Sequence, residues 1–218
     1  MSRPAAFFDL DRTLVRVNSA ALYVRWQVRT GQAPRVELAR MAVWLTQYAL
    51  GLLDAENLAT RAARDLRGQD EGEFARRVRA WAVDELLPQV STTARRTVAR
   101  HTAENVLCAI LTSSTPYSTL PVAEDLGIEH VLSSRLVVAD GAFTGAFVRP
   151  LCYGPGKVSL AEAWAREHDV DLNRSTFYTD SISDLPMLER VGVPIAVNPD
   201  PRLRWAARRR GWRTEQWR

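Results

Sequence analysis

Short apolar runs recur along the chain, and segments of helical spacing separate them. Residues 5–10 (AAFFDL) are apolar until they end in acidic residues, which is typical of a buried strand with polar groups at its carboxyl end. Similar runs cover 106–111, 176–178 and 193–197. Helical spacing covers 91–103, 118–126, 158–168 and 184–190. This order predicts a parallel sheet flanked by helices. The Asp140–Gly141 pair between two short apolar runs, 136–138 and 143–148, predicts a β-hairpin.

From about residue 19 to residue 87 the pattern is helical throughout. Apolar residues recur at intervals of three and four, Gly and Pro are sparse, and no strand-like alternation appears. Pro34 and the regions 54–56 and 68–72 are the expected breaks between helices. We therefore expect a helical domain at 18–88, inserted into an α/β core domain made of residues 1–17 and 89–218.

The composition is that of an ordinary globular protein, with 218 residues, 46% of them hydrophobic and 25% charged. This composition argues against intrinsic disorder, and a chain of this length buries roughly 70% of its unfolded surface without needing disulfides. Only two cysteines are present, and charged residues follow close on the N-terminus, so we expect a cytoplasmic protein. The longest uncharged stretch, residues 41–53, is shorter than the roughly 20 residues of a transmembrane helix.

The net charge of +4 is concentrated at one end of the chain. Residues 201–218 contain seven arginines and one acid, so the rest of the chain carries 29 − 7 = 22 basic and 25 − 1 = 24 acidic side chains. The charge of −2 on residues 1–200 argues against a nucleic-acid-binding surface in that part of the chain. The arginine-rich tail, which also contains three tryptophans, is a nucleic-acid-binding segment, a helix that packs on the domain, or a frayed end.

Two acidic clusters follow apolar runs that are far apart in the sequence. Asp9 and Asp11 come after the first run, and Asp180 and Asp184 follow the run at 176–178. If the backbone stays extended after the first run, Asp9 and Asp11 point to one side. One carboxylate from each cluster would suit Mg²⁺, which prefers oxygen ligands. Taken alone, the first pair indicates a solvated turn rather than a metal site, and the second is equally a pair of helix caps.

Hydroxyl groups and a single lysine also lie where an apolar run ends or a helix is expected to begin. Thr112 and Ser113 follow the run at 106–111 and precede a helix, where they either bind a phosphate oxygen or cap the helix. Lys157 lies in the sequence Gly-Pro-Gly-Lys at the expected start of another helix. Because every other basic residue is an arginine, this lysine marks a place that needs a compact ammonium, or has been retained by chance.

Along the chain, the first acidic pair is followed by the hydroxyl groups, the lysine and the second acidic cluster. These four features resemble, in this order, the four motifs of the haloacid dehalogenase-like superfamily of phosphohydrolases. The matching segments are FDLDRTL (8–14), AILTS (109–113), GPGK (154–157) and YTDSISDLPML (178–188), and the resemblance covers about residues 5–200. The helical segment directly after the first motif is most similar to the phosphoserine phosphatase-like branch. The resemblance implies an α/β fold, with a Rossmann-like parallel sheet flanked by helices and a helical cap inserted after the first strand.

The resemblance also implies a Mg²⁺-dependent phosphatase that hydrolyses a small phosphomonoester. Asp9 matches the nucleophile that becomes an aspartyl phosphate, and Asp11 matches the general acid and base. Asp9, the backbone carbonyl of Asp11 and Asp180 match the ligands of Mg²⁺. Lys157 matches the cation that neutralises the nucleophile and the phosphate, and Asp184 matches a residue that assists the metal site or orients Lys157.

Substrate contacts are implied in the same way. Thr112, with Ser113 beside it, matches the hydroxyl that binds the transferring phosphoryl group. Phosphoserine phosphatases usually carry a glutamate shortly after the first motif, but residues 16–19 here are RVNS, which argues against phosphoserine as the substrate. Arg16 either meets an anionic group of the substrate or is a surface arginine.

Two other functions would use the same kinds of residue. A phosphotransferase or phosphomutase would pass the phosphoryl group to a hydroxyl instead of water. A phospho-receiver signalling protein also places a carboxylate cluster, a Thr or Ser and a Lys on a parallel sheet. The helical insertion and the second acidic cluster argue against a receiver.

Overall fold

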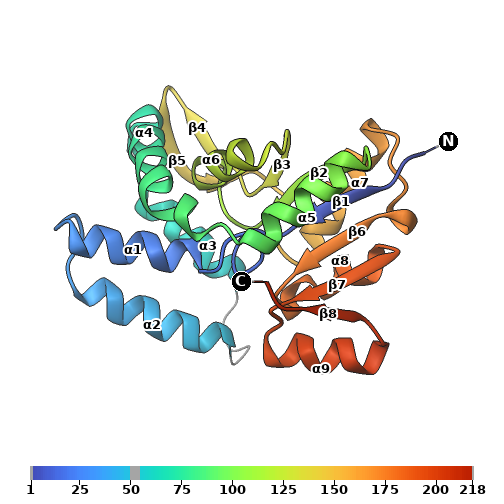
Figure 1. The fold of residues 1–218 in the computed structure, drawn as a ribbon. Coiled ribbons are helices and arrows are strands. Elements are labelled where there is room, and N and C mark those ends of the chain that lie inside the picture. Colours follow the sequence, from blue (N-terminus) through green and yellow to red (C-terminus); the bar gives the residue numbers. More distant parts are fainter. Residues whose placement is uncertain (1, 50–54, 218) are drawn as a thin grey trace.

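The computed structural model describes the backbone of residues 2–49 and 55–217. Within these residues the chain forms a six-stranded sheet with helices on both faces, a helical block beside it and a separate two-stranded hairpin (Figure 1). The predicted α/β class, with a Rossmann-like parallel sheet, is confirmed.

The six strands of the large sheet are all parallel, in the order β3-β2-β1-β6-β7-β8. The strands are β1 (Ala5–Phe8), β2 (Leu107–Thr112), β3 (His130–Ser133), β6 (Thr176–Thr179), β7 (Val193–Val197) and β8 (Arg213–Glu215). β1 lies between β2 and β6 and is buried on both faces, as its uninterrupted apolar sequence requires. The carboxyl ends of β1, β2 and β6 therefore meet at one edge of the sheet.

Successive side chains of β1 enter two different cores, because they point to opposite faces of the sheet. Phe8 packs with α5 (Thr92–Ala103) and α6 (Pro116–Leu126). Phe7 packs on the other face with α7 (Pro155–Glu167), α8 (Leu185–Arg190) and α9 (Pro201–Arg210). Both rings are fully buried, and burial of a ring of this size contributes about 1.5–3 kcal/mol. The two cores hold the end of β1 in place from both sides.

The helical block contains α1 (Ser19–Arg29), α2 (Val36–Ala49), α3 (Ala55–Asp65) and α4 (Glu71–Trp81), and short π and 3₁₀ turns follow at 82–89. Pro34 and residues 68–70 lie between helices as predicted, but residues 71 and 72 of the break predicted at 68–72 already belong to α4. Of the break predicted at 54–56, residues 55 and 56 belong to α3, and residue 54 lies outside the described residues. Asn18 and Asp70 cap α1 and α4 by accepting backbone N–H groups. Among the described helices, none is both long and apolar enough to cross a membrane.

The predicted hairpin is present as β4 (Leu136–Ala139) and β5 (Ala142–Phe147). Asp140 and Gly141 both have positive φ, at 49° and 76°, which suits a tight hairpin turn. The hairpin packs against the helical block, since Phe143 shares a small core with Ala63 of α3. The Gly68 N–H also donates to the Phe143 carbonyl oxygen at 2.8 Å.

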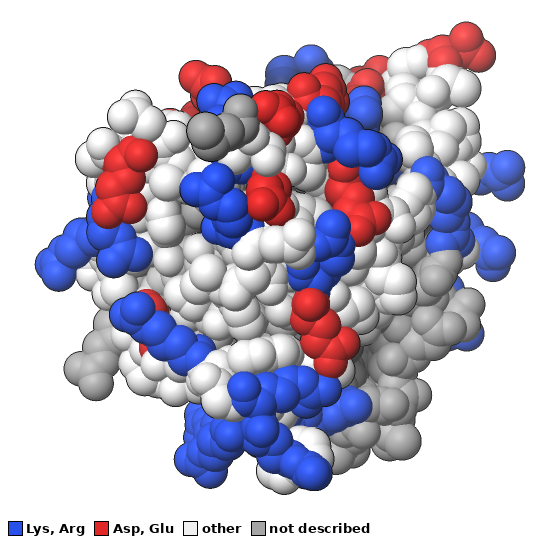
Figure 2. Space-filling view, turned by 90° about the vertical axis from the view of Figure 1, so that its right-hand side faces the viewer, with Lys and Arg blue, Asp and Glu red and all other residues white. Residues whose placement is uncertain are grey.

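The arginine-rich tail is an integral part of the α/β fold. It forms α9 and β8, and Trp217 near its end is only 4% exposed, so the frayed-end interpretation is wrong. Trp205 is 60% exposed, and basic side chains gather at the bottom of the face in Figure 2, where α9 lies. β3 and β8 were not predicted, because β3 (HVLS) has only two apolar residues and β8 (RTE) has none.

Candidate active site

Polar side chains from three neighbouring strands meet at the carboxyl edge of the sheet. Asp9 follows β1, Thr112 ends β2, and Asp180 follows β6. β1 and β6 stay in register to this edge, where the Asp9 N–H donates to the Tyr178 carbonyl oxygen at 2.9 Å. Open α/β sheets typically bind their ligands at this edge.

Lys157 is a buried cation held between two carboxylates. Its Nζ lies 2.8 Å from Asp9 Oδ1 and 2.7 Å from Asp184 Oδ2, and the residue is 2% exposed. Burial alone would lower the pKa of Lys157, but the charges of Asp184 and Asp9 raise that pKa above its usual value. The lysine is therefore protonated, and its three donors match the two acceptors better than a planar guanidinium would.

The loop before α7 explains the Gly-Pro-Gly sequence that precedes Lys157. Gly154 has a φ of 49° and a ψ of −123°, a combination that glycine adopts without strain. A Cβ atom on Gly156 would lie 1.9 Å from the Leu151 carbonyl oxygen, so no larger residue fits there. The close packing of this loop places Lys157 in the first turn of α7, facing the sheet edge.

Asp184 binds the lysine rather than capping a helix. It stands at the N-cap position of α8, but its side chain makes no capping hydrogen bond. Its Oδ2 accepts instead from Lys157 and from Thr179 Oγ1, the latter at 2.6 Å. Thr179 is fully buried and was not predicted as a site residue, because a threonine that ends a strand carries no special signal in the sequence.

The chain turns directly after β1, so Asp9 and Asp11 do not alternate along an extended strand. The strand ends at Phe8, and the Val15 N–H donates back to the Leu10 carbonyl oxygen at 3.0 Å. The two aspartates therefore have different environments. Asp9 is 7% exposed and faces Lys157, whereas Asp11 is bound by residues at the start of α1.

Asn18 and Ser19 hold the Asp11 carboxylate from the start of α1. The Ser19 backbone N–H donates to Oδ1 at 2.9 Å, and Asn18 Nδ2 donates to Oδ2 at 3.1 Å. Burial raises the pKa of Asp11, and these hydrogen bonds partly offset the increase. Neither residue was predicted as part of the site, although an Asn-Ser pair before helical spacing is a recognisable helix start.

Asp9 and Asp180 form a buried acidic pair at the sheet edge. Burial raises the pKa of Asp9 to about 7, with Lys157 opposing the increase. Burial, together with the charge of Asp9, raises the pKa of Asp180 to about 8. No cationic side chain of the described residues forms an ion pair with Asp180. The buried ammonium of Lys157 already pairs with Asp9 and Asp184, so ionised Asp180 has only the charge of the exposed Arg12 side chain to oppose its burial.

Thr112 lies at the same edge, and Ser113 is beside it. Thr112 is 1% exposed, and its Oγ1 accepts the Ser114 N–H at 3.2 Å. Ser113 is exposed. Neither residue caps α6, whose N-cap position is occupied by Thr115 without a side-chain hydrogen bond. The helix-capping interpretation of Thr112 and Ser113 is therefore wrong.

Arg16 lies at the junction between the helical block and the sheet. It is exposed, and its guanidinium donates to the Pro88 carbonyl oxygen at 3.0 Å. Its backbone N–H donates to the Gln89 carbonyl oxygen at 2.9 Å. The contacts of Arg16 are thus with residues 88 and 89, where the chain leaves the helical block and returns to the sheet.

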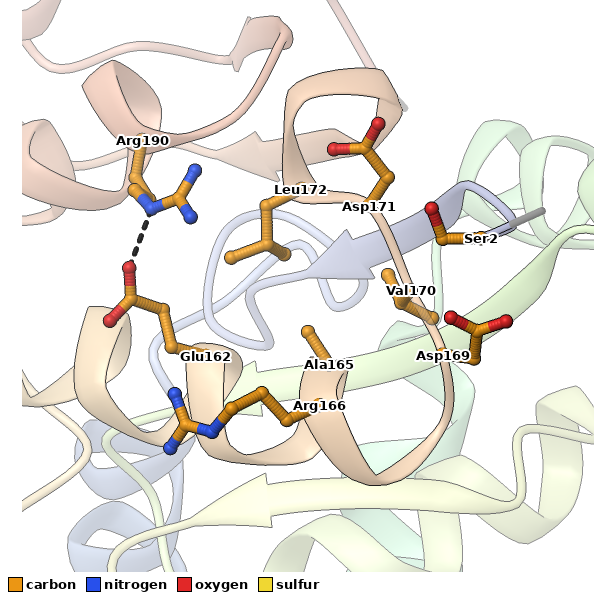
Figure 3. Close-up of a pocket in the computed structure, with 9 residues that line it drawn as sticks. All are labelled: Ser2, Glu162, Ala165, Arg166, Asp169, Val170, Asp171, Leu172 and Arg190. Atoms are coloured by element: carbon orange, nitrogen blue, oxygen red, sulfur yellow. Dashed lines mark hydrogen bonds and ion pairs between the residues drawn. The ribbon is translucent and has the colours of Figure 1, made fainter.

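A groove of about 470 Å³ lies at the opposite, amino-terminal edge of the sheet (Figure 3). Its wall includes Ser2 before β1 and residues 169–172 before β6, and an ion pair between Glu162 and Arg190 crosses one end at 2.6 Å. None of the predicted site residues lines this groove. Among the described residues, no group of three or more His, Cys, Asp or Glu side chains is spaced to hold a metal by itself.

Comparisons with known proteins show the family to which the chain belongs. A family model described as haloacid dehalogenase-like hydrolase matches residues 6–189. A probable phosphatase of Mycobacterium tuberculosis is 32% identical and is matched over 97% of this chain and 74% of its own length. A phosphoserine phosphatase of the same species is 33% identical, over 98% of this chain and 71% of its own length.

Solved structures match nearly the whole chain. A protein of unknown function from Bordetella pertussis has a TM-score of 0.87 and 32% identity, covering 99% of both chains. A phosphoserine phosphatase solved as a phospho-aspartyl intermediate analogue has a TM-score of 0.74 and 17% identity, over 99% of this chain and 94% of that one. The predicted family and enzyme class are confirmed. The chain belongs to the haloacid dehalogenase-like hydrolase family, as a phosphatase of the phosphoserine phosphatase-like kind.

Proposed function

We propose that the chain hydrolyses a small phosphomonoester with Mg²⁺, through an aspartyl phosphate formed on Asp9. The observation that carries this proposal is the buried ammonium of Lys157 between Asp9 and Asp184. A carboxylate cannot approach a dianionic phosphate unless nearby cations offset the repulsion. Lys157 supplies such a charge directly beside the proposed nucleophile.

In the first step, a carboxylate oxygen of Asp9 attacks phosphorus and the bond to the ester oxygen breaks. Asp11 gives its proton to the leaving oxygen, and burial supports this role because it raises the pKa of Asp11. The Thr112 hydroxyl and the backbone N–H of Ser113 bind the non-bridging oxygens of the phosphoryl group. Lys157 neutralises part of the charge on Asp9 and the phosphoryl group.

In the second step, Asp11 accepts a proton from a water molecule whose oxygen attacks the same phosphorus. The bond between phosphorus and Asp9 breaks, which releases inorganic phosphate and restores the carboxylate. Asn18 and Ser19 hold the Asp11 carboxylate in one orientation through both steps. Dividing the hydrolysis in this way lets one residue act first as acid and then as base.

The residues present fit a Mg²⁺ ion. Asp9, the backbone carbonyl of Asp11 and Asp180 would hold the ion, and water would complete its coordination. The acidic pair of Asp9 and Asp180 supports this assignment, because a cation would relieve the unfavourable burial of two carboxylates. When bound, Mg²⁺ neutralises charge that develops on the transferring phosphoryl group. Asp184 acts through Lys157, which it orients.

The proposed substrate is a small phosphomonoester other than phosphoserine. The region after the first motif supports this exclusion: Asn18 and Ser19 bind Asp11, and no acidic residue stands at 16–19 to meet an ammonium group. Binding of an anionic substrate group by Arg16 stays a prediction. The proposed location is the cytoplasm, which agrees with free thiols at Cys108 and Cys152.

We also propose that residues 18–88 form a cap domain that opens and closes over the core of residues 1–17 and 89–218. The two connecting segments lie side by side, which suits a hinge: the Arg16 N–H donates to the Gln89 carbonyl oxygen, and the Ser91 N–H donates to that of Leu14, both at 2.9 Å. Closure would exclude bulk water from the aspartyl phosphate. The hairpin at 136–147 would move together with the cap, because it packs on α3.

A panel of phosphomonoesters tests the proposed function. Purified protein with Mg²⁺ should release inorganic phosphate from at least one small member of the panel in buffer without an added acceptor alcohol. Such release also distinguishes hydrolysis from transfer to a hydroxyl. Failure to release phosphate from any panel member, including a generic aryl phosphate, would count against the proposal.

Thr179→Val should lower both stability and turnover. The substitution keeps the shape but removes the hydroxyl that donates to Asp184, and losing a buried hydrogen bond to a charged group costs about 1.5–3 kcal/mol. Asp184 would then hold Lys157 less rigidly, so we expect kcat to fall by about tenfold. Urea unfolding and steady-state kinetics measure the two effects. Thr179→Ser keeps the hydroxyl and is the matched control; equal results for the valine and serine variants would refute the role of this bond.

Removal of Mg²⁺ should make stability depend on pH. The folded-state pKa of Asp180, about 8, lies above its ordinary value of 3.8, so metal-free protein should lose stability between about pH 4 and pH 8. In EDTA the melting temperature should therefore fall over this range, and Mg²⁺ should restore it at pH 8. Asp180→Asn lacks the titrating group and should show a smaller fall. Parallel curves for the two proteins would contradict the assignment.

A further inference from the structure

Asn198 links two segments that are far apart in the sequence. It directly follows β7, and its Nδ2 donates to the Arg12 carbonyl oxygen at 3.1 Å and to the Trp217 carbonyl oxygen at 3.2 Å. Its Oδ1 accepts the Trp217 N–H at 2.9 Å. One side-chain amide therefore joins the loop after β1 to the end of the described chain.

The backbone of Asn198 explains why an asparagine stands here. Its φ is 44°, a left-handed conformation that asparagine tolerates better than most residues. Its N–H donates to the Glu215 carbonyl oxygen of β8 at 2.9 Å. The hydrogen bonds to Arg12 and Trp217 need a side chain that both donates and accepts, and an amide does both.

The Arg12 backbone is held from both sides. Its φ is 55°, and its N–H donates to the Val17 carbonyl oxygen at 3.1 Å. A trans peptide is planar, so the direction of this N–H sets the opposite direction of the Asp11 carbonyl. Asn198 holds the next carbonyl along the chain, that of Arg12. The two contacts together determine where the Asp11 carbonyl points.

Trp217 extends this link into the core beneath the site. Its ring lies 5.2 Å from the ring of Tyr178, which stacks on Phe8 at 4.9 Å. Phe8 directly precedes Asp9. The indole N–H donates to Glu215 Oε2 at 2.7 Å, which fixes the ring in its buried position. The C-terminal segment thus contacts both the loop and the strand that carry the proposed nucleophile.

We propose that Asn198 is a positioning residue, which ties the segment 213–217 to the loop at 9–13 and thereby orients the Asp11 carbonyl. The role of that carbonyl as a Mg²⁺ ligand rests on the proposed function. The proposal gives the C-terminal segment a part in the active site, although none of its residues contacts the reacting atoms.

Two substitutions of Asn198 and one control test the proposal. Asn198→Asp keeps the acceptor for the Trp217 N–H but loses the donor to Arg12. Asn198→Gly keeps access to the left-handed backbone and removes the whole side chain. Asn105→Asp is the matched control, because Asn105 also has a φ of 55°, is exposed and lies before β2 at the other edge of the sheet. If the glycine variant does not fold, the aspartate variant decides the result.

The first readout is hydrogen exchange of the Arg12 amide in metal-free protein, measured by NMR. Both Asn198 variants should exchange this amide at least about tenfold faster than the wild type, while amides of β2 stay protected. The second readout is the Mg²⁺ concentration that half-saturates the rise in melting temperature. It should increase by about tenfold or more, as is usual when a residue that orients a metal ligand is lost. Asn105→Asp should change neither.

Unchanged Arg12 exchange in both Asn198 variants would overturn the proposal, whatever the protein does with Mg²⁺. Faster exchange with an unchanged Mg²⁺ requirement would also overturn it, because the loop would then not orient a ligand. A wild-type protein that shows no Mg²⁺-dependent rise in melting temperature would instead refute the metal site of the proposed function. The exchange readout still decides in that case whether Asn198 holds the loop.

Discussion

Asp9→Asn is expected to lower phosphomonoesterase turnover by at least about 10⁴-fold, since the variant has no carboxylate oxygen to attack phosphorus. The amide has nearly the same shape, and its oxygen can still accept from Lys157 Nζ, which donates at 2.8 Å in the wild type. Steady-state kinetics with Mg²⁺ and an aryl phosphate measures the loss. Turnover within tenfold of the wild type would remove Asp9 from the role of nucleophile.

The same variant should fold at least as stably as the wild type without Mg²⁺. Burial raises the folded-state pKa of Asp9 to about 7, so the wild type loses stability as pH rises from about 4 to about 7. The neutral amide does not titrate, and above pH 7 its melting temperature in EDTA should equal or exceed that of the wild type. A clearly lower value would mean that inactivity came from damage to the fold.

Lys157→Met should both destabilise the protein and abolish turnover. The ammonium is 2% exposed, and its removal leaves the carboxylates of Asp9 and Asp184 buried without their cation. Breaking a buried pair in this way typically costs about 3–5 kcal/mol. Urea unfolding at pH 7.5 measures the loss of stability, and we expect turnover to fall by at least about 10³-fold.

A double variant separates charge from packing at Lys157. Lys157→Met combined with Asp184→Asn removes the cation and one of its two carboxylates. If unpaired charge is the cause, the double variant should be more stable than Lys157→Met alone. If loss of packing is the cause, the second substitution should add to the destabilisation. That second result would contradict the electrostatic account of this site.

Much of the fold could be predicted because apolar runs carry the signal for buried parallel strands. β1, β2, β6 and β7 have such runs, and their predicted positions agree with the observed strands to within two residues. β8 could not be predicted, because Arg213–Glu215 is polar and pairs only at the edge of the sheet. The position of β8 depends on contacts with β7 and with Trp217, and these contacts cannot be predicted from the local sequence.

The structure brings together side chains that were predicted as site residues, but the residues that support them could not be predicted. Lys157 stood out because it is the only lysine, and the structure places it beside Asp9 and Asp184. Thr179 and Asn198 gave no signal, because a threonine at a strand end and an asparagine in a turn are common. Their significance lies in contacts across the sheet edge, between residues that the fold alone brings together.

Trapping the phosphorylated intermediate tests the central claim most directly. Wild-type protein is mixed with a phosphomonoester and Mg²⁺, quenched in acid during turnover, and digested for mass spectrometry. We predict one phosphoryl group on the peptide that contains Asp9, absent from Asp9→Asn treated in the same way. A phosphoryl group on another residue, or none on the wild type while Asp9→Asn continues to turn over substrate, would contradict the account.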